Sequence, residues 1–244
     1  MSILFSLIKD IFRNKSASGD IREIHSLSSA HPLIGVNKGT HATLDSYPSG
    51  NENKFPTYCI DNDTDITNAS SMLHIGGEET KPGWKILNIQ PGDGVDYVGD
   101  INDLSQFPDG MFDIIYGSHV LEHVSQRNML RTLSGLYRIL SPNGKLMISV
   151  PDLEILCKLF VHPEIDEESR FHVMKMMFGG QTDPFDFHYI GLTHEFMLGY
   201  LGAANFKFVQ RVNEFGIFND ASSYAPYGAP ISLNLIAYKN LPQS

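Results

Sequence analysis

A strand–helix–strand unit in the middle of the chain most constrains its fold. Residues 112–118 form a short apolar run, and residues 126–140 carry apolar side chains at the spacing of a helix with one apolar face. Pro and Gly in residues 141–144 end this helix, and residues 145–150 form a second apolar run. Such a unit joins two parallel strands through a covering helix, so it predicts an α/β fold.

The same pattern continues on both sides of this unit. Short apolar runs separated by turns predict seven strands, at residues 72–76, 85–90, 96–101, 112–118, 145–150, 206–214 and 231–239. Further helices are expected at residues 153–160, 167–178 and 193–204. The predicted fold is therefore a seven-stranded, mostly parallel sheet with helices on both faces.

Residues 1–70 have a different composition from the rest of the chain. Residues 3–12 place apolar side chains at helical spacing, which predicts a short amphipathic helix, and residues 15–70 are rich in small polar residues without periodicity. We therefore expect two regions: an N-terminal helix with an irregular arm in residues 1–70, and a catalytic domain in residues 71–244.

The N-terminal helix is expected to dock on the protein itself or on a partner, and contact with a membrane surface is the alternative. Charges at Lys9 and Asp10 interrupt its apolar run, and no basic region precedes it, which disfavours a cleaved signal peptide. No later apolar run reaches the length of a transmembrane segment.

Composition limits the classes of partner. The chain has 18 Lys and Arg against 28 Asp and Glu, a formal charge of −10, which would repel a nucleic-acid backbone. Its two cysteines, Cys59 and Cys157, are too few for a disulfide framework or a four-thiolate zinc site. We therefore expect a cytoplasmic protein that does not bind nucleic acid.

A series of motifs supplies the functional prediction. The pair Gly76–Gly77 follows the first predicted strand, where bare backbone lets a ligand approach. Alone this is a weak signal, but further segments follow it in order: Lys-Ile-Leu-Asn-Ile-Gln at 85–90, Val-Asp-Tyr-Val-Gly-Asp-Ile-Asn-Asp-Leu at 95–104, Phe-Asp-Ile-Ile-Tyr-Gly-Ser-His-Val-Leu-Glu-His at 112–123 and Leu-Ser-Pro-Asn-Gly-Lys-Leu at 140–146.

This series resembles the class I, Rossmann-like methyltransferases that use S-adenosylmethionine (SAM). The likeness is closest to small bacterial methyltransferases associated with cell-surface saccharide biosynthesis, and it covers roughly residues 72–240. It implies a Rossmann-like sheet, SAM as the cofactor, and a small molecule or saccharide as the methyl acceptor.

The resemblance also implies how SAM is bound. Gly76 and Gly77 would border its methionine part, Gln90 would face the ribose hydroxyls, and Asp103 would lie beside the adenine. Two positions depart from the family pattern, since His74 and Gln90 stand where acidic residues are common. A glutamine amide still bonds two hydroxyls but lacks the charge of a carboxylate, so weakened SAM binding is expected.

Ser118 and His119 would close the cofactor pocket on the side of the reactive sulfonium. Methyl transfer needs an aligned nucleophile and, in some cases, a base, but it does not require a metal. His119, His123 and His188 are the candidate bases, because imidazole titrates near neutral pH. The alternative for each histidine is a hydrogen-bonded structural role.

Three further features have competing interpretations. Residues 119–123 match the zinc-protease pattern H-x-x-E-H, with Glu195 as a conceivable third ligand, but they directly follow a strand in the methyltransferase-like series. Asp152 is expected to cap a helix rather than to orient substrate. The aromatic residues in 171–189 would form either a lid or ordinary core.

The sequence thus predicts transfer of a methyl group from SAM to oxygen or nitrogen of a small molecule or saccharide. One alternative is a binding or scaffold protein that has lost activity, which the substitutions His74 and Gln90 motivate. A zinc hydrolase is the less favoured alternative.

Overall fold

The computed structural model describes residues 57–60, 66–67 and 69–241. The predicted amphipathic helix at residues 3–12 and most of the arm lie outside these residues. No helix in the described part of the chain is long and apolar enough to cross a membrane.

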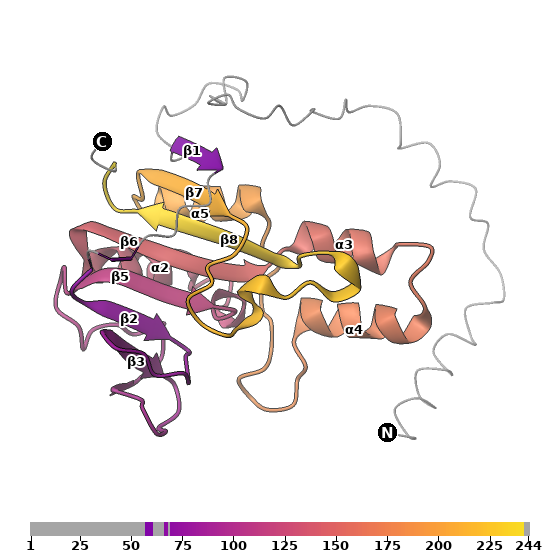
Figure 1. Ribbon diagram of the computed structural model, residues 1–244, viewed down its shortest axis with the longest axis horizontal. Coiled ribbons are helices and arrows are strands. Elements are labelled where there is room, and N and C mark those ends of the chain that lie inside the picture. Colours follow the sequence, from indigo (N-terminus) through magenta and orange to yellow (C-terminus); the bar gives the residue numbers. More distant parts are fainter. Residues whose placement is uncertain (1–56, 61–65, 68, 242–244) are drawn as a thin grey trace. The chain divides into compact units, whose positions relative to one another are not determined.

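The described residues form one eight-stranded sheet (Figure 1) in the order β1-β7-β8-β6-β5-β2-β3-β4. All seven predicted strands are present, which confirms the predicted α/β fold. An eighth strand, β1, comes from the segment predicted to be an irregular arm and pairs with β7. The strands are β1 Thr57–Ile60, β2 Met72–Ile75, β3 Trp84–Asn88, β4 Tyr97–Val98, β5 Phe112–Ser118, β6 Leu140–Pro151, β7 Phe208–Val212 and β8 Ser232–Tyr238.

The order of the strands creates a crevice at one edge of the sheet. From β2 the chain adds β3 and β4 on one side, then returns to place β5 and β6 on the other. β2 and β5 are parallel neighbours, with Ile75 opposite Gly117, so the loops that leave these two strands diverge from adjacent points. Ligands of open α/β sheets bind at such a reversal of strand order.

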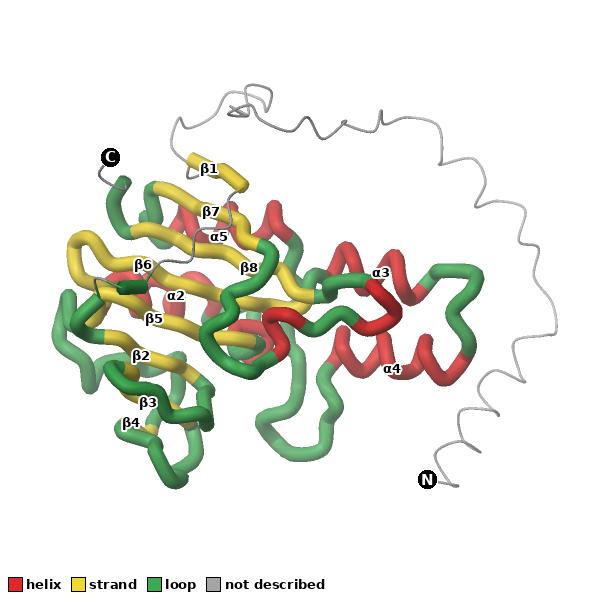
Figure 2. Tube along the Cα trace, in the orientation of Figure 1, coloured by secondary structure: helices red, strands yellow, loops and turns green. Residues whose placement is uncertain are grey.

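Two helices cover one face of the sheet (Figure 2): α2, Met129–Ile139, and α5, His194–Ala203. Leu133 on α2 and Leu201 on α5 are fully buried in the same core as Leu73 and Ile115 of the sheet. α2 presents its apolar residues on one side, as its sequence predicts. This packing removes that face of the sheet from water and provides its main hydrophobic stabilisation.

The opposite face departs from the prediction that helices cover both faces. In the described structure it is covered by residues 213–231, an irregular segment with two short 3-10 turns, η3 Ala221–Ser223 and η4 Pro226–Gly228. Phe215 and Phe218 from this segment pack on Trp84 and Tyr116 of the sheet. Large aromatic rings thus bury this face without a helix.

His74 belongs to this aromatic cluster rather than to the crevice. Its ring is stacked on Phe218, with the ring centroids 3.9 Å apart, and it is only 5% exposed. Gly77 fits against the same ring, because a Cβ on Gly77 would lie 2.2 Å from His74. His74 therefore completes the covered face, which explains a histidine at a position where the family pattern has an acid.

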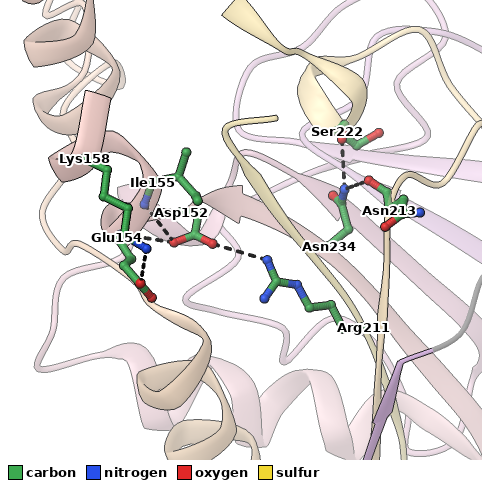
Figure 3. A network of polar contacts seen from close by, with 8 residues as sticks. All are labelled: Asp152, Glu154, Ile155, Lys158, Arg211, Asn213, Ser222 and Asn234. Atoms are coloured by element: carbon green, nitrogen blue, oxygen red, sulfur yellow. Dashed lines mark hydrogen bonds and ion pairs between the residues drawn. The ribbon is translucent and has the colours of Figure 1, made fainter. Parts of the chain in front are cut away.

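Polar contacts fasten the covering segment to the sheet (Figure 3). Asn234 in β8 donates hydrogen bonds from Nδ2 to the carbonyl oxygens of Asn213, at 2.7 Å, and Ser222, at 2.9 Å. Tyr116 in β5 donates its hydroxyl hydrogen to Asp220 Oδ2. The Ser222 carbonyl needs such a donor, because Ser222 is buried and water does not reach it.

Helices α3, Leu153–Phe160, and α4, Glu167–Phe178, lie beyond the end of β6 and pack against each other (Figure 1). Asp152 precedes α3, and its Oδ1 accepts hydrogen bonds from the backbone N–H groups of Glu154 and Ile155 (Figure 3). This confirms the predicted helix cap. The two helices therefore lie beyond the edge of the sheet at which β6 ends.

We predict that Asn234→Ala lowers the free energy of unfolding by about 2 kcal/mol, because the buried side chain of Asn234 then no longer donates to the carbonyls of Asn213 and Ser222. Asn240→Ala is the matched control: its Nδ2 also bonds a carbonyl, that of Pro142, but the side chain is exposed. Urea unfolding of both variants measures the difference, and equal losses would contradict the role given to Asn234.

His74 should make the fold acid-sensitive. Burial lowers the pKa of His74 from 6.5 to about 4 in the folded protein, while the unfolded chain keeps the higher value. Between these values the unfolded state binds a proton that the folded state does not, so stability is lost as the pH falls through this window. The difference corresponds to about 3 kcal/mol at most.

We therefore expect His74→Gln to flatten the decline of stability between pH 6.5 and 4, although its loss of packing lowers stability at neutral pH. Burial also lowers the pKa of His194 to about 4, so part of the decline remains. His162→Gln, at an exposed histidine, should leave the decline unchanged. Unfolding midpoints measured across this pH range test the expectation, which fails if the His74 and wild-type profiles are parallel.

Candidate active site

A large cavity occupies the crevice at the carboxyl ends of β2, β3 and β5. Its volume is about 920 Å³, within the range of pockets that hold small ligands and cofactors. Residues at the ends of these strands and in the loops after β2, β3, β4 and β5 line it, among them Gly76, Asn88, Gln90, Asp100, Ser118 and His119. The cavity is thus at the place where the sequence predicts SAM.

The predicted glycine pair divides into two roles. Gly76 lines the cavity and has φ +72°, and a Cβ there would lie 2.8 Å from Val120 Cγ2. Gly77 is not among the lining residues, and its small size is required by the His74 ring. Of this pair, therefore, only Gly76 presents bare backbone to the cavity.

The end of β3 contributes a residue that the sequence analysis did not select. The strand stops at Asn88, and both Asn88 and Gln90 line the cavity. Asn88 Nδ2 donates to the Gly77 carbonyl at 3.2 Å, and its Oδ1 accepts from the Gln90 backbone N–H at 3.0 Å. Asn88 therefore links the loops after β2 and β3, a role that its position at a strand end could have indicated.

The loop after β4 lines the cavity through Asp100 and Asn102 rather than through the predicted Asp103. The Asn102 backbone N–H and side-chain Nδ2 both donate to Asp100 Oδ1, at 2.8 and 2.9 Å. Asp103 is exposed and accepts a hydrogen bond from the Ser105 backbone N–H. The polar residues of this turn that line the cavity are thus Asp100 and Asn102, three residues and one residue before the predicted Asp103.

A second cavity of about 320 Å³ adjoins the first. It is lined by the end of β6, by α4, by the loop after α4 and by the covering segment, and its lining is rich in ionisable and hydroxyl groups: His119, His172, Lys175, Asp186, His188 and Tyr224. His119 and Asp186 line both cavities. The two cavities therefore share a wall at these side chains.

His119 is held rigidly in this wall. Its φ of +54° is unusual for a residue with a side chain, and its backbone N–H donates to the Ser149 carbonyl at 2.9 Å. The ring nitrogen Nε2 lies 2.8 Å from Ser232 Oγ, and Nδ1 lies 3.3 Å from Glu122 Oε1. These contacts fix the orientation of the ring between the two cavities.

Asp186 is positioned by the loop after α4. Its Oδ1 accepts from the Gly180 N–H at 3.2 Å, and its Oδ2 accepts from the Thr182 hydroxyl at 3.0 Å. The same loop is anchored to the β5 side, because the Tyr189 N–H donates to the Glu122 carbonyl at 2.8 Å. Phe185 and Tyr189 are exposed and line the larger cavity, so they are not ordinary core.

The other two predicted histidines lie beside each other. His123 lines the larger cavity and His188 the smaller one, and their ring centroids are 4.9 Å apart. Burial lowers the pKa of His188, which favours its neutral form. The structure therefore brings all three candidate bases to the boundary between the cavities.

The H-x-x-E-H segment does not form the helix that a zinc protease requires. Residues Leu121–His123 form a single 3-10 turn, η2, and His119 precedes it with a positive φ. The His119 ring faces Ser232 instead of sharing a helix face with His123. Glu195 is exposed in the first turn of α5. The arrangement that the less favoured zinc-hydrolase alternative requires is therefore not formed.

Comparisons with known proteins agree with the methyltransferase prediction. Residues 64–148 match the family model described as a methyltransferase domain. The chain is 29% identical over 169 residues to the ubiquinone/menaquinone biosynthesis C-methyltransferase UbiE of Pseudoalteromonas translucida, covering 64% of each protein. It is 33% identical over 107 residues to UbiE of Escherichia coli, covering 43% of this chain and 37% of the relative.

The chain thus spans at most about two thirds of the length of these curated relatives. Among solved structures, it is similar to a SAM-dependent methyltransferase from Archaeoglobus fulgidus, with a TM-score of 0.46 and 16% identity, covering 71% of this chain and 88% of the other. The sequence matches thus show that part of this chain, including residues 64–148, is similar to methyltransferases.

We predict that Gly76→Ala weakens SAM binding at least tenfold, about 1.4 kcal/mol, because the added Cβ forces the loop and Val120 apart at the cavity wall. Gly216→Ala is the matched control, since Gly216 also has a positive φ, +63°, but has nothing within 4 Å of an added Cβ. Calorimetric titration with SAM compares them. Equal affinities in the two variants would contradict a binding role for Gly76.

Proposed function

We propose that this protein transfers the methyl group of SAM to an oxygen or nitrogen atom of a small polar molecule, with a saccharide as the favoured acceptor. SAM occupies the larger cavity and the acceptor the smaller one. The observation that supports this most directly is the wall that the two cavities share at His119 and Asp186. Methyl transfer requires adjoining sites for donor and acceptor, because the methyl group and the attacking atom must be close together and in line.

The residues of the larger cavity fit SAM. Gly76 leaves backbone accessible where the methionine part would lie, and Asn88 and Gln90 offer amide groups to ribose hydroxyls. Asp100 adds a carboxylate, and SAM carries positive charge on its sulfonium and amino groups. The cavity lies at the reversal of strand order, where α/β folds bind such ligands.

When bound, SAM supplies a methyl group already activated by positively charged sulfur. The chain then has to hold the acceptor, exclude water and accept a proton where the acceptor atom carries one. The His188 ring lines the acceptor cavity and is kept neutral by burial, so it can accept that proton. His119, fixed by Ser232 and Glu122, orients the acceptor at the boundary.

The lining of the smaller cavity supports a hydroxylated acceptor. Lys175, Asp186 and Tyr224 provide donors and acceptors within a volume of about 320 Å³, enough for a small polar molecule. The similarity to UbiE favours a different acceptor atom, because UbiE is named as a C-methyltransferase. Methylation of carbon is therefore the second candidate.

The alternative of a binding or scaffold protein without activity is supported by one substitution fewer than the sequence indicated. His74 was one departure from the family pattern, and its ring lies in the aromatic cluster on the covered face, not in the cavity. The other departure, Gln90, does line the cavity. A weaker SAM site is thus compatible with this chain, and a lost one is not required.

Isotope-labelled transfer tests the proposed function. The full chain is incubated with SAM carrying a ¹³C methyl group and with fractionated polar metabolites, and labelled products are found by mass spectrometry. The ¹³C chemical shift of the product distinguishes methyl bound to oxygen or nitrogen from methyl bound to carbon. A product methylated at carbon favours the second candidate, and a protein that binds neither SAM nor its demethylated product contradicts both.

We expect His188→Ala to lower the rate of transfer about 100-fold or more, because removal of a positioned proton acceptor has effects of this size. SAM affinity should change little, since His188 lines only the smaller cavity. His162→Ala, at an exposed histidine between α3 and α4, should alter neither quantity. Rates equal to wild type would return His188 to a structural role.

A further inference from the structure

Three side chains at the boundary between the cavities are arranged as metal ligands. Glu122, His123 and His188 each offer one ligand atom, and these atoms lie within 4.8 Å of one another. They come from two separate segments, the turn after β5 and the loop after α4. The group is therefore assembled by the fold and differs from the H-x-x-E-H set, which would have used His119.

The buried carboxylate is the first sign that this group has a ligand. Glu122 is only 1% exposed, its Oε2 has no hydrogen-bond partner, and its Oε1 has only the 3.3 Å contact with His119 Nδ1. Burial of a carboxylate without such partners is costly, and a bound cation would offset that cost.

The hydrogen bonds of the two histidines are the second sign. His123 Nδ1 lies 3.1 Å from the Phe187 carbonyl oxygen, so this nitrogen carries the hydrogen and Nε2 keeps a free lone pair. The His188 ring also bonds the backbone of Met177. Histidine ligands of metals typically donate their other N–H to a carbonyl or carboxylate, which orients the ring.

We propose that Glu122, His123 and His188 bind a divalent transition-metal ion such as Zn²⁺. Two imidazoles and one carboxylate are the protein ligands of many catalytic zinc sites, which keep a further position open for water or substrate. An ion held by these ligands would lie next to both cavities, because His123 lines the larger one and His188 the smaller one. The proposal departs from the sequence expectation that no metal is needed.

The site also specifies a role, which rests on the proposed function. An acceptor hydroxyl next to the ion would give up its proton to solvent water more readily, because a divalent cation stabilises the oxyanion that remains. The oxygen that attacks the methyl group would then be held at the wall between the cavities. His188 would act on the acceptor through the metal instead of as a free base.

Cobalt binding tests the site without an assay of activity. The full chain, prepared without a histidine tag and stripped with a chelator, is titrated with Co²⁺, whose visible absorption reports nitrogen and oxygen ligands. We expect about one equivalent to bind per chain and to be displaced by Zn²⁺. Absence of Co²⁺ and Zn²⁺ binding to the folded wild-type protein would overturn the proposal.

Variants locate the bound ion. His188→Ala should weaken Co²⁺ binding more than about 100-fold, the upper end of the loss seen when only an outer partner is removed. Glu122→Gln is the second ligand variant, and circular dichroism verifies that each variant is folded. His172→Ala is the control, because His172 lines the same small cavity but is outside the ligand group. Equal loss in His172→Ala and His188→Ala would assign the ion elsewhere.

Calorimetry with SAM on the metal-free protein separates the two proposals. If SAM binds and Co²⁺ does not, the metal site is wrong and the methyltransferase proposal stands. If Co²⁺ binds and SAM does not, the metal site stands and the proposed function is wrong.

Discussion

The pairing of β2 with β5 is the contact on which the functional geometry depends. It places the loop that starts at Gly76 beside the turn that contains His119, although the two are more than forty residues apart in sequence. Val120 packs within reach of Gly76, so the two loops form one continuous wall. If the sheet reversed its order at another strand, neither cavity would have these linings, because both depend on where the β5 turn meets its neighbours.

The covered face shows how the sheet is completed without a helix. The connection from β2 to β3 has only eight residues, 76–83, fewer than parallel neighbours usually need for a crossover helix. Aromatic residues of segment 213–231 bury the face instead. The His74 ring stacks on Phe218, and Gly77 leaves room for the His74 ring. The same segment supplies Tyr224 and Ile231 to the smaller cavity, so the substitute for a helix also builds part of the acceptor site.

Periodicity predicted the elements well, because strands and α2 are defined by local patterns of apolar residues. All seven strands follow from such patterns, whereas β1 pairs with a strand about 150 residues away and no local pattern indicates it. Of the residues that the resemblance assigns to SAM, Gly76, Gln90, Ser118 and His119 line the larger cavity, and Asp103 does not. Positions within turns depend on backbone geometry and side-chain bonds, and these shift a polar group by one to three residues without changing the motif.

The meaning of residues 119–123 is decided by one backbone angle. On a regular helix His119 and His123 would share a face one turn apart, as a zinc protease requires. The positive φ of His119 ends β5 abruptly and turns its ring to Ser232, while the following 3-10 turn directs His123 toward His188. Glu122 is left buried between them with oxygens that lack hydrogen bonds. This short motif contributes to both cavities because His119 lines both of them, while His123 lines the larger one and contacts His188. A sequence pattern alone does not indicate this arrangement.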